Sequence, residues 1–154
     1  MPTQEYSQAL EKLKSYCAYQ ERCEFEVVKK IEGFNLDSSY TQKIVLELKQ
    51  LNYLDNRRFA DAYCSGKFKM KGWGKRKIYT ELKARYVPGE IISSALNTID
   101  DDEYKSKLIE IANKKWKLLN QNTDMKTRHR LSRFLYGKGY EAELINDFLG
   151  SLNQ

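Results

Sequence analysis

The sequence is poor in the residues on which disulfide, metal and catalytic sites depend. Its 154 residues include three cysteines, two prolines and one histidine. Cys17, Cys23 and Cys64 are odd in number and form no Cys-x-x-Cys pair, so neither a disulfide framework nor a zinc site is indicated. We therefore expect free thiols, half buried in helices.

Catalytic patterns are equally scarce. The chain has no GxxxxGK[ST] phosphate loop, and its histidine, His129, lies between Arg128 and Arg130, which disfavour the charged imidazolium. An exposed polar position is expected for His129 instead of a catalytic role. The consecutive acids at 100–103 do not point to one centre, as the alternating ligands of a calcium loop do, and predict a helix cap. The sequence predicts no catalytic residue, no metal and no cofactor.

Long apolar runs are absent too. No stretch approaches the roughly 18 to 20 consecutive apolar residues of a membrane span. Residues 1–13 (MPTQEYSQALEKL) have neither the order of a signal peptide nor the Arg/Ser-rich character of a transit peptide. The sequence therefore predicts a cytoplasmic chain without a membrane partner.

The pattern that is present is helical. Apolar residues recur mostly three and four positions apart, which predicts an all-α fold of short helices that bury their apolar faces against one another. Asp55 and Asp100 are expected to cap helices that start about 46 residues apart. Corners are expected at 72–74, at Pro88-Gly89 and at 137–139. The expected helices of the second and third units are 56–70, 75–85, 89–99, 101–119, one ending near 136, and a last one.

The order of helices and corners recurs along the chain. Residues 78–96 and 131–149 each read as a short helix, a tight link, an acidic first turn and a second apolar helix. We therefore predict three tandem three-helix repeats, at 1–54, 55–100 and 101–154. Repeats that contact only their neighbours give an elongated, slightly curved array, which offers a long binding surface.

Charge is concentrated in the centre of the chain. Residues 1–55 hold seven Lys/Arg against nine Asp/Glu, residues 56–100 hold ten against four, and residues 101–154 hold ten against eight, which gives −2, +6 and +2. Such a central excess favours an anionic partner, either nucleic acid or an acidic protein groove, although a solvated lysine-rich face is the plain alternative. The candidate binding residues are Lys67, Lys69, Lys71, Trp73, Lys75, Arg76, Lys77, Arg128, Arg130 and Arg133.

Aromatic residues accompany these cations. Trp73, flanked by two glycines, can plug the joint between two helices or project as an anchor, and plugging is the safer interpretation. The tyrosines beside the cations can stack on unpaired bases, but we expect most of them to complete small cores. Those tyrosines are Tyr63, Tyr79, Tyr86, Tyr136 and Tyr140.

Three stretches resemble motifs of the RecX family of bacterial recombination regulators. Residues 54–60 (LDNRRFA) resemble LDDxRFA, residues 72–82 (GWGKRKIYTEL) resemble GxGxxxIxxEL, and residues 134–140 (FLYGKGY) resemble FLxxRGY. The motif positions expected to shape the fold are Asp55, Phe59, Ala60, Gly72, Gly74, Leu82 and Gly139. The chain departs from the family at Asn56, usually Asp, and at Tyr86, where a left-handed corner would be strained and the turn is expected to move toward Pro88-Gly89.

The resemblance implies three tandem three-helix repeats, in agreement with the pattern above. It also implies a non-enzymatic, monomeric partner of the RecA recombinase, which lies in the helical groove of the RecA filament on single-stranded DNA. Suppressed ATP hydrolysis, strand exchange and coprotease action would follow. Direct binding of nucleic acid by a helical module is the alternative.

Overall fold

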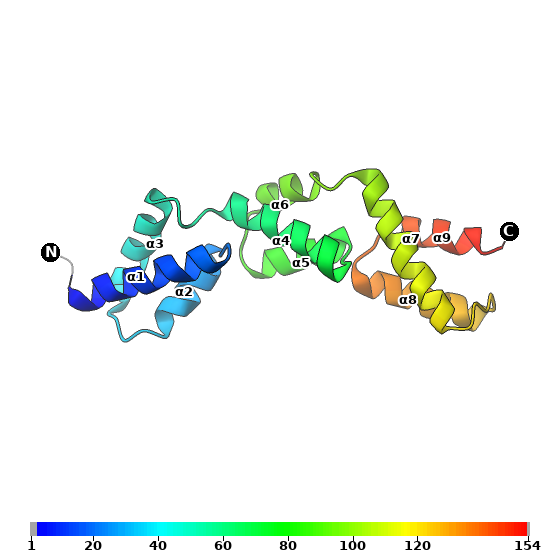
Figure 1. Cartoon of the computed structure of the whole chain (residues 1–154), viewed down its shortest axis with the longest axis horizontal. Coiled ribbons are helices and arrows are strands. Elements are labelled where there is room, and N and C mark those ends of the chain that lie inside the picture. Colours follow the sequence, from blue (N-terminus) through cyan, green and yellow to red (C-terminus); the bar gives the residue numbers. More distant parts are fainter. Residues whose placement is uncertain (1–2, 154) are drawn as a thin grey trace.

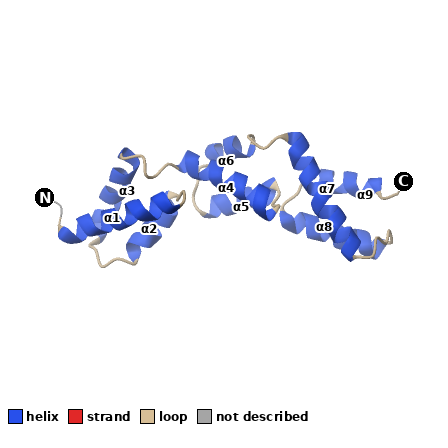
Figure 2. Ribbon diagram, viewed as in Figure 1, coloured by secondary structure: helices blue, strands red, loops and turns tan. Residues whose placement is uncertain are grey.

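The computed structural model describes residues 3–153, and over that range the chain is helical with no β-strand (Figure 2). The helices follow one another along a long axis, with the two ends of the chain at opposite ends of the molecule (Figure 1). The helices are α1 (Gln4–Tyr19), α2 (Glu24–Glu32), the 3₁₀ turn η1 (Ser38–Tyr40), α3 (Thr41–Gln50), α4 (Asn56–Lys71), α5 (Lys75–Ala84), α6 (Gly89–Leu96), α7 (Asp101–Leu118), α8 (Met125–Lys138) and α9 (Ala142–Ser151).

Three groups of three helices make up the array: an N-terminal unit (α1–α3), a central unit (α4–α6) and a C-terminal unit (α7–α9) (Figure 1). The predicted all-α fold of three-helix repeats is thereby confirmed. The repeat limits 1–54, 55–100 and 101–154 stay a prediction.

Aspartate side chains start the first helix of each of the last two units, as predicted. The Asp55 carboxylate accepts a hydrogen bond from the Arg58 amide at 3.0 Å, and that of Asp100 accepts one from the Glu103 amide at 3.0 Å. Each bond satisfies an amide of the first helical turn that has no partner within the helix. Local sequence therefore fixes where α4 and α7 begin.

Two corners differ from the sequence prediction. The backbone of Tyr86 is left-handed, with φ of 60°, so the turn is not displaced toward Pro88-Gly89. The strain at Tyr86 is offset because the Val87 amide bonds back to the Leu82 carbonyl at 3.2 Å and the Val87 side chain is buried. At the other corner α8 continues through Gly137 to Lys138, and Gly139 alone makes the turn, with φ of 103°.

The apolar core is divided into two clusters. The N-terminal unit has its own cluster, built on Leu13, Ile44 and Leu48. The central and C-terminal units share one continuous cluster, because Tyr104 of α7 stacks against both Phe68 of α4, at 5.8 Å, and Tyr140, at 5.2 Å. The last two units are therefore joined more closely than independent repeats would be.

Candidate functional site

Two glycine corners meet where the central unit joins the C-terminal unit. The Gly74 amide donates to the Lys138 carbonyl at 2.8 Å, and the Arg76 amide donates to the Gly139 carbonyl at 3.0 Å. A Cβ atom on Gly74 would lie 2.4 Å from the Gly139 carbonyl carbon, and one on Gly139 would lie 2.5 Å from the Lys77 Cβ. Only glycine permits this backbone approach. The C-terminal carbonyls of α8 thus satisfy free amides at the start of α5.

Buried tyrosines complete this joint. The Tyr140 hydroxyl donates to the Gly72 carbonyl at 2.9 Å, and the Tyr104 hydroxyl accepts from the Lys75 amide at 2.8 Å while it donates to the Glu141 carboxylate. Burial raises the pKa of both tyrosines well above the usual value, and the Glu141 hydrogen bond raises that of Tyr104 further. Both hydroxyls therefore stay protonated and act as fixed donors.

Next to the joint, cations alternate with aromatic rings. The Lys67 Nζ lies 4.9 Å and the Lys77 Nζ 4.5 Å from the centroid of the half-buried Trp73 ring. Lys67 also lies over Tyr63 at 5.3 Å, as does the Arg85 guanidinium at 5.1 Å. We call Arg85, Tyr63, Lys67, Trp73 and Lys77 the cation–aromatic strip. The Trp73 side chain therefore plugs the joint, as the sequence favours, and also holds two of the candidate cations.

Two further candidates contact other aromatic rings. The Lys75 Nζ lies 5.0 Å from the Tyr104 ring, and the Arg76 guanidinium lies 4.0 Å from the Tyr136 ring and donates to its hydroxyl at 2.8 Å. Consecutive residues at the start of α5 thus contact different partners, because each residue turns the side chain about 100° around the helix. Lys69 and Lys71 are exposed near the end of α4.

The arginines of α8 do not form one group. The Arg128 guanidinium donates to the Leu149 and Thr123 carbonyls, each at 2.9 Å, and to the Asn153 side chain, so it ties the end of α9 to the start of α8. Arg130 and Arg133 are exposed and line a shallow depression with Lys115 and Phe134. His129 is exposed, as expected.

The tyrosines are divided between core and surface. Tyr140 is fully buried and Tyr63 is half buried, but Tyr79, Tyr86 and Tyr136 are exposed, so the expectation that most of them complete cores is wrong for these three. Two important rings were not among the sequence candidates. Tyr104, at the first turn of α7, contacts Lys75 of α5, and Phe134 contacts Lys115 of α7 at 4.9 Å as well as Lys138 of its own helix at 5.8 Å. Only the alternation of aromatic and basic residues in the sequence hinted at them.

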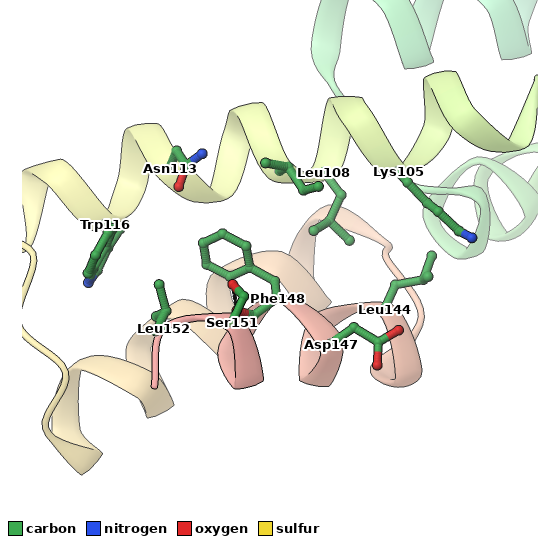
Figure 3. A pocket seen from close by; sticks show the side chains of 10 residues that line it. Lys105, Leu108, Asn113, Trp116, Leu144, Asp147, Phe148, Ser151 and Leu152 are labelled. Atoms are coloured by element: carbon green, nitrogen blue, oxygen red, sulfur yellow. Dashed lines mark hydrogen bonds between the residues drawn. The ribbon is translucent and has the colours of Figure 1, made fainter. Parts of the chain in front are cut away.

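A largely apolar groove of about 470 Å³ lies between α7 and α9 (Figure 3). Leu108, Trp116 and Phe148 line it, and Lys105 lies toward the end opposite Trp116 (Figure 3). Its polar groups do not form a pair of nucleophile and base. Within residues 3–153 no group of three or more His, Cys, Asp or Glu side chains is placed to hold a metal ion, and no helix is long and apolar enough to cross a membrane.

The fold and surface define a class of protein: an all-helical repeat protein that presents cations on aromatic rings. Two family models match the chain, RecX second three-helix domain over residues 55–96 and RecX third three-helix domain over residues 101–149. The regulatory protein RecX of Chlorobaculum tepidum is 32% identical over 126 residues, which are 82% of this chain and 75% of that protein. The chain therefore belongs to the RecX family.

Other relatives are longer than this chain. The regulatory protein RecX of Clostridium tetani is 30% identical over 133 residues, 85% of this chain and 61% of that protein. A Clostridium botulinum relative of the same name is 31% identical over 119 residues, and the match spans 54% of its length. The chain thus matches little more than half the length of these two relatives.

Solved structures agree with the fold. The crystal structure of RecX from Lactobacillus salivarius superposes with a TM-score of 0.83, at 19% identity, over 97% of each chain. A second crystal structure, of a regulatory protein RecX, has a TM-score of 0.84 at 17% identity and covers 96% of this chain and 72% of the other. The three-helix units are therefore arranged here as in those proteins.

Proposed function

We propose that the chain is a non-enzymatic regulator of the RecA recombinase. It acts in the cytoplasm as a monomer, lies in the helical groove of the RecA filament on single-stranded DNA, and inhibits ATP hydrolysis, strand exchange and coprotease activity. Membership of a family whose curated members are named regulatory proteins supports a regulatory role. The observation that carries the proposal is an elongated array whose central unit holds a net charge of +6, which suits an extended anionic partner.

The cation–aromatic strip is the proposed centre of the contact. Lys67 and Lys77 are held in place by Trp73, so that less side-chain entropy is lost when they bind an acidic group. The other proposed contact residues are Lys69, Lys71, Lys75, Arg76, Arg130 and Arg133. We assign Arg128 a structural role instead, because each of its three side-chain nitrogens already donates a hydrogen bond within the chain.

The direct test is a titration of DNA-dependent ATP hydrolysis by the cognate RecA. The chain should inhibit hydrolysis, and the double variant Lys67→Glu/Lys77→Glu should require at least about tenfold more protein for the same inhibition, as expected when two charge contacts are reversed. Lys29→Glu/Lys30→Glu is a matched control, because these exposed lysines also lie over aromatic rings but belong to the acidic N-terminal unit. Undiminished hydrolysis at severalfold molar excess of the chain would refute the proposal.

Direct binding of nucleic acid is the second candidate, and the cation–aromatic strip favours it. Rings beside cations bind single strands because bases stack on the rings and phosphates pair with the cations. Fluorescence anisotropy with a labelled oligothymidylate, at two salt concentrations and with or without RecA, separates the candidates. Tight, steeply salt-dependent binding without RecA supports this second function. Binding that requires RecA supports the first.

A further inference from the structure

The two joints of the array have the same plan but different chemistry. In each, the corner between the first two helices of one unit packs against the link between the last two helices of the next. At the C-terminal joint the corner at 72–75 meets Gly139, and at the N-terminal joint the corner at 20–25 meets Tyr86. Gly139 and Tyr86 both have left-handed backbones, so the two links have the same local shape.

The residue at the link decides how closely the units approach. Gly139 has no side chain, and two backbone hydrogen bonds cross that joint. Tyr86 has a side chain that is 77% exposed and packs on Phe25 with ring centroids 5.2 Å apart. Among the described residues no backbone hydrogen bond joins α1–α3 to α4–α6. Because an aromatic contact lets one ring slide over the other, the N-terminal joint constrains rotation much less.

The polar contacts at the N-terminal joint are also weak. The Arg58 side chain, itself exposed, bonds to the Glu21 carboxylate and to the Asn52 carbonyl, each at 2.9 Å. Exposed ion pairs of this kind stabilise by about 0 to 1 kcal/mol and are screened by salt. Of the N-terminal residues that the structure describes, only Cys23 and Phe25 extend into the core of the other two units.

A cleft of about 420 Å³ lies at this joint. Glu21 and Glu26 line one wall, and Lys67 and Arg85, two cations of the cation–aromatic strip, line the other. Among the described residues neither Glu21 nor Glu26 pairs with Lys67 or Arg85, because Glu21 pairs with Arg58 at the edge of the cleft and Glu26 accepts from the Cys23 amide. The width of the cleft therefore depends on how the N-terminal unit is oriented.

We propose that the N-terminal unit turns as one body on the linker 51–55, while α4–α9 form one rigid unit. Turning in one direction brings the carboxylates of Glu21 and Glu26 toward Lys67 and Arg85 and covers that end of the cation–aromatic strip. Turning in the other direction exposes it. The proposal does not depend on the RecA proposal, because it rests on the contacts at the two joints alone.

Distance distributions between pairs of spin labels, measured by double electron–electron resonance, test the proposal. One double variant, Ser15→Cys/Ser93→Cys, spans the N-terminal joint, and another, Ser93→Cys/Asn146→Cys, spans the C-terminal joint. All three positions are exposed. The native cysteines are buried, and burial raises the pKa of Cys23 to about 11 and that of Cys64 to about 12, so they should remain unlabelled at neutral pH. The unsubstituted chain is the control for labelling.

The distribution across the N-terminal joint should be at least about twice as wide as the other, as expected for hinge motion beside a rigid unit. Raising the salt from ~50 mM to ~500 mM should widen or shift only that distribution, because the Arg58 ion pair is screened. Adding Gly139→Ala to the second pair should widen its distribution and so show that the measurement detects a loosened joint. If the two labelled double variants that retain Gly139 give distance distributions of equal width, the proposal is overturned.

Discussion

Gly139→Ala should loosen the joint between the last two units, and its cost can be divided into two parts. A left-handed alanine costs roughly 1 to 2 kcal/mol of backbone strain. The new Cβ would also lie 2.5 Å from the Lys77 Cβ and 2.6 Å from the Lys77 amide nitrogen. Overpacking of this kind costs roughly 1 to 3 kcal/mol. We therefore expect a loss of about 2 to 5 kcal/mol in the free energy of unfolding.

Substitutions at two other glycines separate the cost of backbone strain from the cost of overpacking. Gly74 has φ of −80°, which alanine adopts without strain, but its Cβ would lie 2.4 Å from the Gly139 carbonyl oxygen. Gly74→Ala should therefore cost only the overpacking, about 1 to 3 kcal/mol. Gly137 is helical with nothing within 4 Å of a Cβ, so Gly137→Ala should stabilise α8 by about 0.5 to 1 kcal/mol.

Urea unfolding followed by far-UV circular dichroism measures these differences. Because the two methyl groups would enter the same contact, the double variant Gly74→Ala/Gly139→Ala should lose less than the sum of the single losses. If Gly139→Ala is as stable as Gly137→Ala, the close backbone contact does not join the two units, and the reasoning fails.

Three further predictions concern single side chains. Tyr140→Phe should lower the free energy of unfolding by about 1 to 3 kcal/mol, because it leaves the buried Gly72 carbonyl without a donor; Tyr136→Phe, at an exposed hydroxyl, should change it by less than about 0.5 kcal/mol in the same urea assay. Hydrogen bonding to the Thr127 side chain and to its amide lowers the pKa of Asp124, so the stabilisation is present above the unfolded-state pKa and lost as pH falls through the folded-state value. Thermal unfolding from pH ~5 to ~2 should therefore show a larger loss for the unaltered chain than for Asp124→Asn, and equal losses would contradict this assignment. If the chain binds oligothymidylate, Lys67→Gln should reduce the slope of log affinity against log salt by about 1, and an unchanged slope would remove Lys67 from the phosphate contacts.

Much of the fold could be predicted from the sequence because its determinants are local. An aspartate just before a helical apolar pattern caps the helix by accepting a hydrogen bond from an amide of the first turn, and both Asp55 and Asp100 do so. The corner at Gly72 was predictable because it too has a local determinant: glycine adopts the left-handed backbone, and the φ of Gly72 is 69°. The strain expected at Tyr86 misled the prediction, because burial of the next residue, Val87, cannot be read from backbone preference alone.

The candidate site was harder to predict because its contacts join distant parts of the chain. Spacing along the sequence identified the cations of α5 but not the partner ring of each, such as Tyr136, which lies 60 positions from Arg76. Neither could spacing show that Gly74 touches Gly139, since that contact depends on how two helical units are oriented. Charge content identified the region, and only the packing of the units assigned each cation to an aromatic partner.

The hydrogen bonds between the end of α8 and the start of α5 also affect how cooperatively the last two units unfold. Without the C-terminal unit, the amides of Gly74 and Arg76 would lose their acceptors, the Gly72 carbonyl would lose its donor, and the apolar face of Phe68 would meet water. A fragment that stops at residue 100 should therefore melt well below the intact chain. We therefore expect residues 56–151 to unfold as one cooperative domain, although the sequence pattern divides them into two repeats.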